Sequence, residues 1–234
     1  MTMSVIGIIG AMDAEVVGLI AKLDGHKIDS VGGMEFHTGK LLGREVVIAR
    51  CGVGKVFAAM CAEAMIIRYS PELIVNTGVA GGLDATLKCG DIVVAEKLCQ
   101  HDMDTSALGD DKGLISGINK VYFESDSAAI DALMLSGYEL GITVKRGTIA
   151  TGDKFVADDS ERERIVSEFG ASACEMEGGA IAHTAFVAGV PFVVVRAISD
   201  GANSDSAMDF PTFLKIAARK SEALTLALVE KYKK

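Results

Sequence analysis

Short apolar runs alternate with segments of helical periodicity along almost the whole chain. Short continuous apolar runs are typical of buried strands, whereas apolar residues three and four apart indicate the buried face of a helix. We therefore expect strands over 5–9, 34–40, 45–50, 73–77, 91–99, 142–151, 171–176 and 192–198. Helices are expected over 11–23, 127–137, 161–169, 213–232, from the Gly-Gly pair at 178 to about 188, and from the end of 51–56 to about 69. This alternation predicts an α/β fold.

Residues 171–200 are the most informative stretch, because they predict a strand, a helix and a second strand in direct succession. We interpret them as a βαβ unit. An acid follows each strand, Glu177 after the first and Asp200 after the second. Ligands of parallel sheets bind outside the carboxyl ends of the strands. Both carboxylates are therefore expected on one rim.

Glu15 adds a third carboxylate to this rim, because it follows the strand at 5–9 and begins the next helix. The loops at the rim carry few cations, no Ser in a GxSxG motif and no Cys/His couple. Separate carboxylates in an apolar crevice suit general acid and base catalysis, and hydrolysis of a sugar bond is the best-known example. The alternative is that these acids only interact with the dipoles of the helices that they precede.

Composition narrows the class of protein. The chain has 234 residues, half of them hydrophobic, without a Pro/Ser-rich linker, charge block or repeat, which favours a single domain over 1–234. A net charge of −9 argues against nucleic acid or an anionic membrane as a partner. The N-terminus lacks a basic region followed by an apolar core, and no apolar run reaches the roughly 18 residues of a spanning helix. We therefore expect a cytoplasmic protein.

Three further segments allow other interpretations. Lys55 follows a GxG sequence, which suggests a phosphate loop, but Walker spacing is absent and close packing of strand and helix is favoured. GVAGGL at 78–83 predicts a glycine-rich loop near a ligand, without the GxGxxG of dinucleotide sites. His101, Asp102 and Asp104 could be metal ligands, although a hydrogen-bonded, gate-forming or interface loop is favoured. Five cysteines without a CxxC pair indicate buried thiols rather than disulfides or a zinc site.

Short motifs along the chain also carry a resemblance to a known family. They are GIIGAMDAEV (7–16), CGVGKV (51–56), NTGVAGGL (76–83), GDIVV (90–94), HDMDTSA (101–107), TGDKFV (151–156), EMEGGAIAH (175–183) and PFVVVRAISD (191–200). In this order and at these separations the chain resembles the bacterial 5′-methylthioadenosine/S-adenosylhomocysteine nucleosidases of the nucleoside phosphorylase/nucleosidase superfamily. The resemblance implies one α/β domain with a mixed, barrel-like central β-sheet flanked by helices, usually paired as a homodimer.

The activity that the resemblance implies is hydrolysis of the N-glycosidic bond of adenine nucleosides with a 5′-thio substituent. It implies that Asp200 protonates adenine N7, with Ser199 helping to hold that acid. Glu15 would activate the attacking water, Arg196 would lie close by, and Glu177 would bind the ribose 2′ and 3′ hydroxyls. No metal or organic cofactor is expected, because protonating adenine and deprotonating water need only side chains.

The remaining site residues follow from the same resemblance. Phe155 and the backbone of Val156 would hold the adenine, and Phe210 would close over the 5′ group. Thr105 and Leu108 match a loop that reaches a neighbouring subunit's site. The walls of the substrate site would be completed by Met12, Val53, Val79, Gly81 and Met176.

Four features depart from the commonest pattern of that family. Val79 stands where many relatives have Ser, Leu108 where an aromatic residue is usual, and Gly178-Gly179 where Ala or Thr is common. The segment after Gly109 is also shortened. The last three features bear on the preference for a 5′ substituent and on the dimer contact.

Three alternatives to this nucleosidase remain. A purine nucleoside or uridine phosphorylase of the same fold needs cations to bind phosphate, and Glu15 at the nucleophile position would repel that anion. A catalytically silent nucleoside-binding protein would make all three acids incidental. A nucleosidase with 6-amino-6-deoxyfutalosine as its main or additional substrate would differ in the 5′ pocket.

Overall fold

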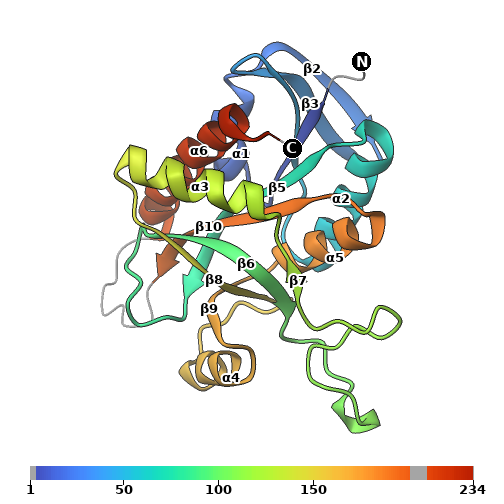
Figure 1. Cartoon of the computed structure of the whole chain (residues 1–234), viewed down its shortest axis with the longest axis vertical. Coiled ribbons are helices and arrows are strands. Elements are labelled where there is room, and N and C mark those ends of the chain that lie inside the picture. The colour runs from blue at the N-terminus through green and yellow to red at the C-terminus, as the bar shows by residue number, and fades with distance from the viewer. Residues whose placement is uncertain (1–3, 201–209, 234) are drawn as a thin grey trace.

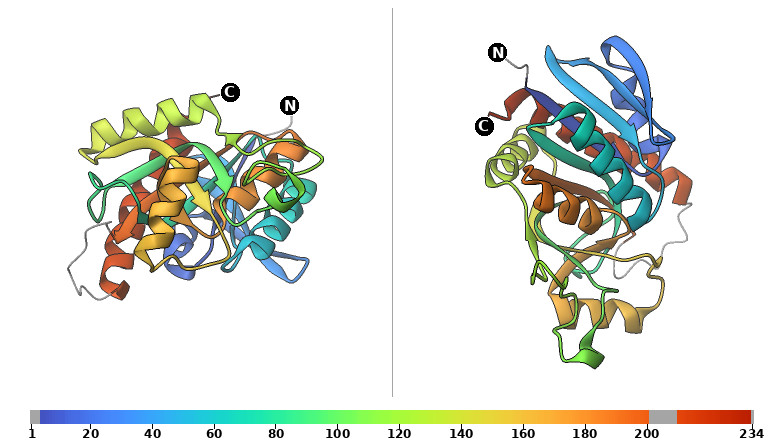
Figure 2. Two further views of the ribbon diagram at one scale, coloured as in Figure 1. Left: turned by 90° about the horizontal axis from the view of Figure 1, so that it is seen from below. Right: turned by 90° about the vertical axis from the view of Figure 1, so that its right-hand side faces the viewer.

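The computed structural model describes residues 4–200 and 210–233, and the side chains of these residues apart from 200 and 210–216. No helix in these described ranges is long and apolar enough to cross a membrane. Figure 1 and Figure 2 show helices packed around a strongly curved central sheet.

The centre of the fold is a closed, mixed ring of strands. Its members pair in the order β5 (Leu73–Gly82), β10 (Phe192–Asp200), β6 (Ile92–Gln100), β8 (Val144–Thr151) and β9 (Ala171–Glu175), and β9 pairs with β5 again. The sheet continues from β5 through β1 (Val5–Gly10), β4 (Arg44–Arg50), β3 (Met34–Leu41) and β2 (Asp24–Val31), while the short β7 (Phe123–Glu124) pairs with β6. The predicted mixed, barrel-like α/β fold is confirmed.

Helices cover the sheet in two groups (Figure 1). One group packs against β5 and β10 and consists of α1 (Asp13–Ile20), α3 (Ser127–Leu140) and α6 (Phe210–Lys231). The other consists of α2 (Lys55–Tyr69) and α5 (Gly178–Ala188), which pack against each other. Each group closes its own hydrophobic core over one side of the sheet. A third, smaller core lies under α4 (Asp159–Phe169), beside β8 and β9.

Local signals explain where several helices begin and end. The Asp126 carboxylate accepts a hydrogen bond from the backbone N–H of Ala129 at the start of α3, and Asp158 caps α4 through Ser160 in the same way. Gly141 and Gly170 follow these two helices in the left-handed conformation, which glycine adopts without a steric penalty. Six helices had been expected from periodicity, and all six are present in the described residues.

Three strand assignments differ from the sequence-based prediction, and one of them is the two-residue β7, which was not predicted. β2 was not predicted, because almost all of its residues are exposed and it carries no apolar pattern; pairing with β3 holds it. The predicted glycine-rich loop at 78–83 is also wrong, since β5 continues through Gly82. Its glycine residues pair with β10 on one side and with β9 on the other, so backbone hydrogen bonding maintains the strand where side chains contribute little.

The predicted parallel βαβ unit needs a correction. β9 and β10 are separated by β5, which runs parallel to β10 and antiparallel to β9. The ring closes where the end of β5 pairs antiparallel with β9, rather than by a crossover between adjacent parallel strands. The cysteine prediction agrees with the structure at four positions, because Cys51, Cys61, Cys99 and Cys174 are buried, whereas Cys89 is half-buried.

Candidate active site

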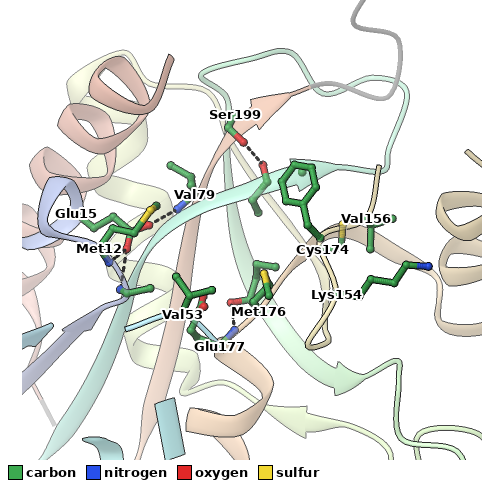
Figure 3. Close-up of a pocket in the computed structure, with 15 residues that line it drawn as sticks. Met12, Glu15, Val53, Val79, Lys154, Val156, Cys174, Met176, Glu177 and Ser199 are labelled. Carbon is green, nitrogen blue, oxygen red and sulfur yellow. Dashed lines mark hydrogen bonds between the residues drawn. The ribbon is translucent and has the colours of Figure 1, made fainter. Parts of the chain in front are cut away.

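A cavity of about 280 Å³ lies where β1, β5, β9 and β10 end. Ten of the residues predicted for the site line it, as Figure 3 shows for most of them: Met12, Glu15, Val53, Val79, Gly81, Phe155, Val156, Met176, Glu177 and Ser199. Five other residues complete the lining: Ala11, Ala80, Lys154, Cys174 and Glu175. The tertiary structure therefore brings together residues from distant parts of the chain in one mostly apolar hollow.

Glu15 is held in the cavity wall by backbone donors. Its Oε2 accepts hydrogen bonds from the N–H groups of Ala11 at 2.7 Å and Met12 at 2.9 Å, and its Oε1 accepts from Val79 at 3.1 Å. Burial raises the pKa of Glu15, and the nearby Arg196 charge and these N–H groups offset the increase only in part. A fixed, buried carboxylate with increased proton affinity in a mostly apolar cavity is suited to accept a proton from water.

Two glycine residues make room for this carboxylate. A Cβ atom on Gly78 would lie 2.6 Å from Oε1 of Glu15 and 2.9 Å from Nη1 of Arg196. A Cβ atom on Gly10 would lie 2.7 Å from a methyl carbon of Val16. Gly10 at the end of β1 and Gly78 within β5 thus allow α1 to approach the sheet closely enough for Glu15 to reach it.

Arg196 lies beneath the cavity rather than in its lining. Its guanidinium group is fully buried and forms an ion pair with Glu175, including a hydrogen bond of 3.2 Å from Nε to Oε2. It also donates to Oδ1 of Asn76, whose Nδ2 donates to the Ile9 carbonyl. Burial opposes the charge of Arg196, but the surrounding carboxylates outweigh it and its pKa is raised. Arg196 therefore supplies a permanent positive charge under three acidic residues.

Glu177 is the second carboxylate that faces the cavity. Its Oε1 accepts a hydrogen bond of 2.9 Å from the backbone N–H of Gly54, and its Oε2 lies 3.8 Å from Nη2 of Arg196. Burial, followed by the charge of Glu175, raises the pKa of Glu177 to about 7. At neutral pH this carboxyl group can therefore exchange a proton or accept hydrogen bonds from hydroxyl groups.

Glu175 is the main residue that the sequence-based prediction missed. Its side chain is buried and accepts hydrogen bonds from the N–H groups of Glu177 at 3.1 Å and Gly178 at 2.7 Å, at the start of α5. A signal was present, because Glu175 and Glu177 are two residues apart at the end of an apolar strand, and such residues project to the same side of an extended chain. Lys154 was also missed, and Figure 3 shows it extending outward beside Val156.

Ser199 and Asp200 end β10 at the cavity. Oγ of Ser199 donates to the Ala80 carbonyl at 3.3 Å. The backbone of Asp200 pairs with Gly81, which also lines the cavity, while the side chain of Asp200 lies outside the described residues. Phe210 is the first residue of α6, and its side chain also lies outside the described part.

The long segment between β6 and β7 extends away from the body of the molecule (Figures 1 and 2). It contains Thr105, whose Oγ1 donates to Asp110, and the short 3₁₀ helix η1 (Ser106–Leu108). Leu108 is 84% exposed. Neither of the two residues predicted to reach a partner subunit lines this chain's own cavity.

The metal interpretation of this segment finds no support among the described side chains. Nδ1 of His101 contacts Arg164, Asp102 forms an ion pair with Lys55, and Asp104 accepts hydrogen bonds from Ser106. Within residues 4–199 and 217–233, no group of three or more potential ligands could hold a metal ion. These polar residues instead stabilise the loop, as the hydrogen-bonded interpretation predicts.

The mixed five-strand ring, with buried carboxylates at its strand ends, belongs to a chain that matches a known superfamily. Residues 5–230 match the family model described as the phosphorylase superfamily. A 5′-methylthioadenosine/S-adenosylhomocysteine nucleosidase of Shewanella sediminis is 39% identical over 96% of this chain and 98% of its own length. Together these matches show that the chain belongs to the 5′-methylthioadenosine/S-adenosylhomocysteine nucleosidase family within that superfamily.

Solved structures agree with this assignment. The nucleosidase of the same name from Neisseria meningitidis, in complex with methylthio-immucillin-A, has a TM-score of 0.93 and 34% identity, with 98% of this chain and all of the other covered. A futalosine hydrolase of Helicobacter pylori has a TM-score of 0.91 and 34% identity over 98% of this chain and 99% of its own.

Proposed function

We propose that this chain hydrolyses the N-glycosidic bond of 5′-methylthioadenosine and S-adenosylhomocysteine, releasing adenine and the corresponding 5-thio-ribose. The observation that carries the proposal is Glu15, a buried carboxylate held by three backbone N–H groups at the wall of an apolar cavity. Family membership supports the same reaction, and 5′-deoxyadenosine fits the same requirements. The enzyme would serve methionine salvage and the methyl cycle, including the route to the autoinducer-2 precursor.

The reaction uses the carboxyl groups in separate roles. Glu15 accepts a proton from the attacking water, whose oxygen forms a bond to C1′ as the bond between C1′ and N9 breaks. Asp200 donates a proton to N7, so that adenine leaves as a neutral base, and Ser199 holds this acid. Glu177 binds the ribose 2′ and 3′ hydroxyls, and Arg196 balances the charge of the acids from below. Proton donation to a leaving group and proton removal from water each lower the barrier.

The cavity walls position the nucleoside. Phe155 and the backbone of Val156 hold the adenine. Val156 lies opposite the side of the cavity that carries Glu15 (Figure 3). Phe210 closes over the 5′ group. The sugar and its 5′ substituent contact the remaining wall residues: Met12, Val53, Val79, Gly81 and Met176.

The chain acts as one domain over 1–234 and as a cytoplasmic homodimer. Support for the pairing comes from exposed apolar side chains on the outer faces of the adjacent helices α2 and α5 and just before α2: Val53, Val56, Phe57, Met60, Ile67, Phe186 and Val187. Burial of such a surface against a second copy removes it from water. Thr105 and Leu108 then approach the partner's cavity.

The direct test supplies 5′-methylthioadenosine with and without phosphate. Equal release of adenine and a free reducing sugar in both reactions is expected, and a chelator should leave the rate unchanged. A ribose 1-phosphate product, or a rate that depends on phosphate, would contradict hydrolysis.

A second candidate substrate is 6-amino-6-deoxyfutalosine. The observation that favours it is the similarity to the Helicobacter pylori futalosine hydrolase, at a TM-score of 0.91. Comparison of kcat/KM across 5′-methylthioadenosine, S-adenosylhomocysteine, 5′-deoxyadenosine and the futalosine derivative decides between them. The proposal expects the thio-substituted nucleosides to give the highest values.

A further inference from the structure

Three polar residues outside the cavity form a closed set of contacts, which we call the Asp102 network: Lys55, Asp102 and Asp153. Oδ1 of Asp102 accepts from Nζ of Lys55 at 2.7 Å, and Oδ2 of Asp102 accepts from the backbone N–H of Asp153 at 2.9 Å. The carboxylate of Asp153 in turn accepts from the backbone N–H of Lys55 at 2.7 Å. Each member therefore contacts both of the others, although they lie on three separate segments of the chain.

One end of the Asp102 network adjoins the ribose side of the cavity. Lys55 begins α2, directly after Val53, which lines the cavity, and Gly54, whose N–H donates to Oε1 of Glu177. A Cβ atom on Gly54 would lie 3.0 Å from Oδ1 of Asp153, so the two segments are in close contact. A shift of the start of α2 would therefore move the N–H donor that orients Glu177.

The other end adjoins the base side. Asp153 is followed two and three residues later by Phe155 and Val156, which line the cavity. This segment contains neither helix nor strand between Gly152 and Asp158. Val156 is buried in the third core, which fixes the end of the segment, whereas Phe155 is 67% exposed. The hydrogen bonds of Asp153 hold its beginning. His101 packs against the same turn, because a Cβ atom on Gly152 would lie 2.3 Å from its Nε2.

The charges within the network are arranged to keep it intact at neutral pH. Half-burial acts to raise the pKa of Asp102, but the hydrogen bonds from Lys55 and from the Asp153 N–H outweigh it, and the pKa is lowered. Both partners in the Lys55–Asp102 ion pair are largely shielded, with 20% and 29% of their side chains exposed. The ion pair also occupies the ammonium group of Lys55, the cation that a phosphate-loop interpretation would have required.

We infer that Lys55 and Asp102 are positioning residues for nucleoside binding, because the Asp102 network ties the segment carrying Phe155 and Val156 to the N–H donor that orients Glu177. The inference rests on the proposed function, in which the segment carrying Phe155 and Val156 binds the base and Glu177 binds the ribose. Neither residue touches the substrate. They act by holding both binding elements at a fixed separation, which reduces the ordering cost of binding.

The test compares Asp102→Ala, Asp102→Asn, Lys55→Met and Lys55→Arg with the wild type. Kinetics with 5′-methylthioadenosine, calorimetric binding of adenine alone and thermal unfolding are measured for each protein. Asp102→Ala and Lys55→Met should raise KM and the adenine Kd by about tenfold, as expected for one or two lost hydrogen bonds, while kcat changes by less than about threefold. Lys55→Arg should retain most of the affinity, and Asp102→Asn should fall between the wild type and Asp102→Ala.

Asp131→Asn is the matched control, because it weakens an exposed ion pair with Arg146 that is remote from the cavity. Its KM, kcat and adenine Kd should equal those of the wild type. The double variant Lys55→Met/Asp102→Ala should bind no more weakly than either single variant, because both remove the same link. If Asp102→Ala proves unstable, the contrast between Lys55→Met and Lys55→Arg decides by the same measurements.

The inference is overturned if folded Asp102→Ala and Lys55→Met keep KM and the adenine Kd within about twofold of wild type, or if only kcat falls. Failure of the proposed function would be seen separately. In that case the wild type itself would release no adenine from 5′-methylthioadenosine, before any variant is compared.

Discussion

Gly78 and Glu15 are in such close contact that a single Cβ atom on Gly78 would lie 2.6 Å from Oε1 of Glu15. Gly78 is 63 positions away from Glu15 in the sequence and lies in β5, which contacts α1. The backbone of β5 thereby approaches the carboxylate closely enough for the Val79 N–H to donate to it. The position of Glu15 depends on the absence of a side chain at Gly78 as much as on its own hydrogen bonds.

Gly78→Ala should therefore damage both stability and activity. The added methyl group contacts Glu15 and Arg196, and overpacking of this kind costs about 1–3 kcal/mol of unfolding free energy. Displacement of Glu15 should also lower kcat. Gly43→Asn, in the turn between β3 and β4, is the control, because Asn tolerates the left-handed backbone found there. An unchanged kcat in Gly78→Ala would show that this contact does not position Glu15.

Glu15→Gln should lower kcat by about a hundredfold to ten-thousandfold, the range typical of a lost general base. The amide cannot accept a proton from water, whereas the shape of the side chain is kept. Measured adenine release should fall while thermal unfolding confirms a folded protein, and Glu35→Gln, an exposed acid in β3, should retain full activity. Near-normal release by Glu15→Gln would rule out this residue as the base.

The dependence of kcat/KM on pH should be bell-shaped. On the acid side, burial raises the pKa of Glu15, and burial with the charge of Glu175 raises the pKa of Glu177 to about 7. Both carboxyl groups must be ionised for activity, so kcat/KM should fall as the pH drops below about 7. The fall of kcat/KM on the basic side reflects loss of the proton that Asp200 donates to adenine. The limbs describe the coupled site as a whole. A flat profile from about pH 5 to 9 would contradict these roles.

Glu177 should also make stability depend on pH. Its pKa is about 7 in the folded state against an ordinary value of 4.5, so the folded protein binds the proton more tightly than the unfolded chain. The resulting stabilisation is complete below pH 4.5 and is lost as the pH rises through about 7. The free energy of unfolding of the wild type, relative to Glu177→Gln, should therefore decrease between these values. Parallel curves for the two proteins would argue against the raised pKa.

Phe57→Glu should dissociate the proposed homodimer. Phe57 is 53% exposed on the outer face of α2, among the other apolar side chains proposed to form the subunit contact. A carboxylate buried there without a partner would be strongly disfavoured. Sedimentation should show a dimer for the wild type and a monomer for Phe57→Glu. Tyr138→Glu, on the exposed side of α3, is the control and should remain dimeric.

Much of the fold could be predicted from local pattern. The helices were located by apolar periodicity, and most strands by short apolar runs, because each of these elements buries one face in a core. β2 lacked such a face and was missed, while the glycine residues of β5 predicted a loop in a segment that pairs on both sides. Pattern also could not predict how the ring closes, since β9 and β10 both pair with β5 but in opposite directions.

The sequence by itself determined which residues could carry the chemistry. Glu15 and Glu177 follow apolar strands and both face the cavity, but their spacing along the chain says nothing about their proton affinities. Only the tertiary structure decided those, because desolvation and the nearby charges of Glu175 and Arg196 act through space. The same reason explains why Glu175 and the Asp102 network were not predicted: their roles arise from contacts between segments that are brought together only when the sheet closes.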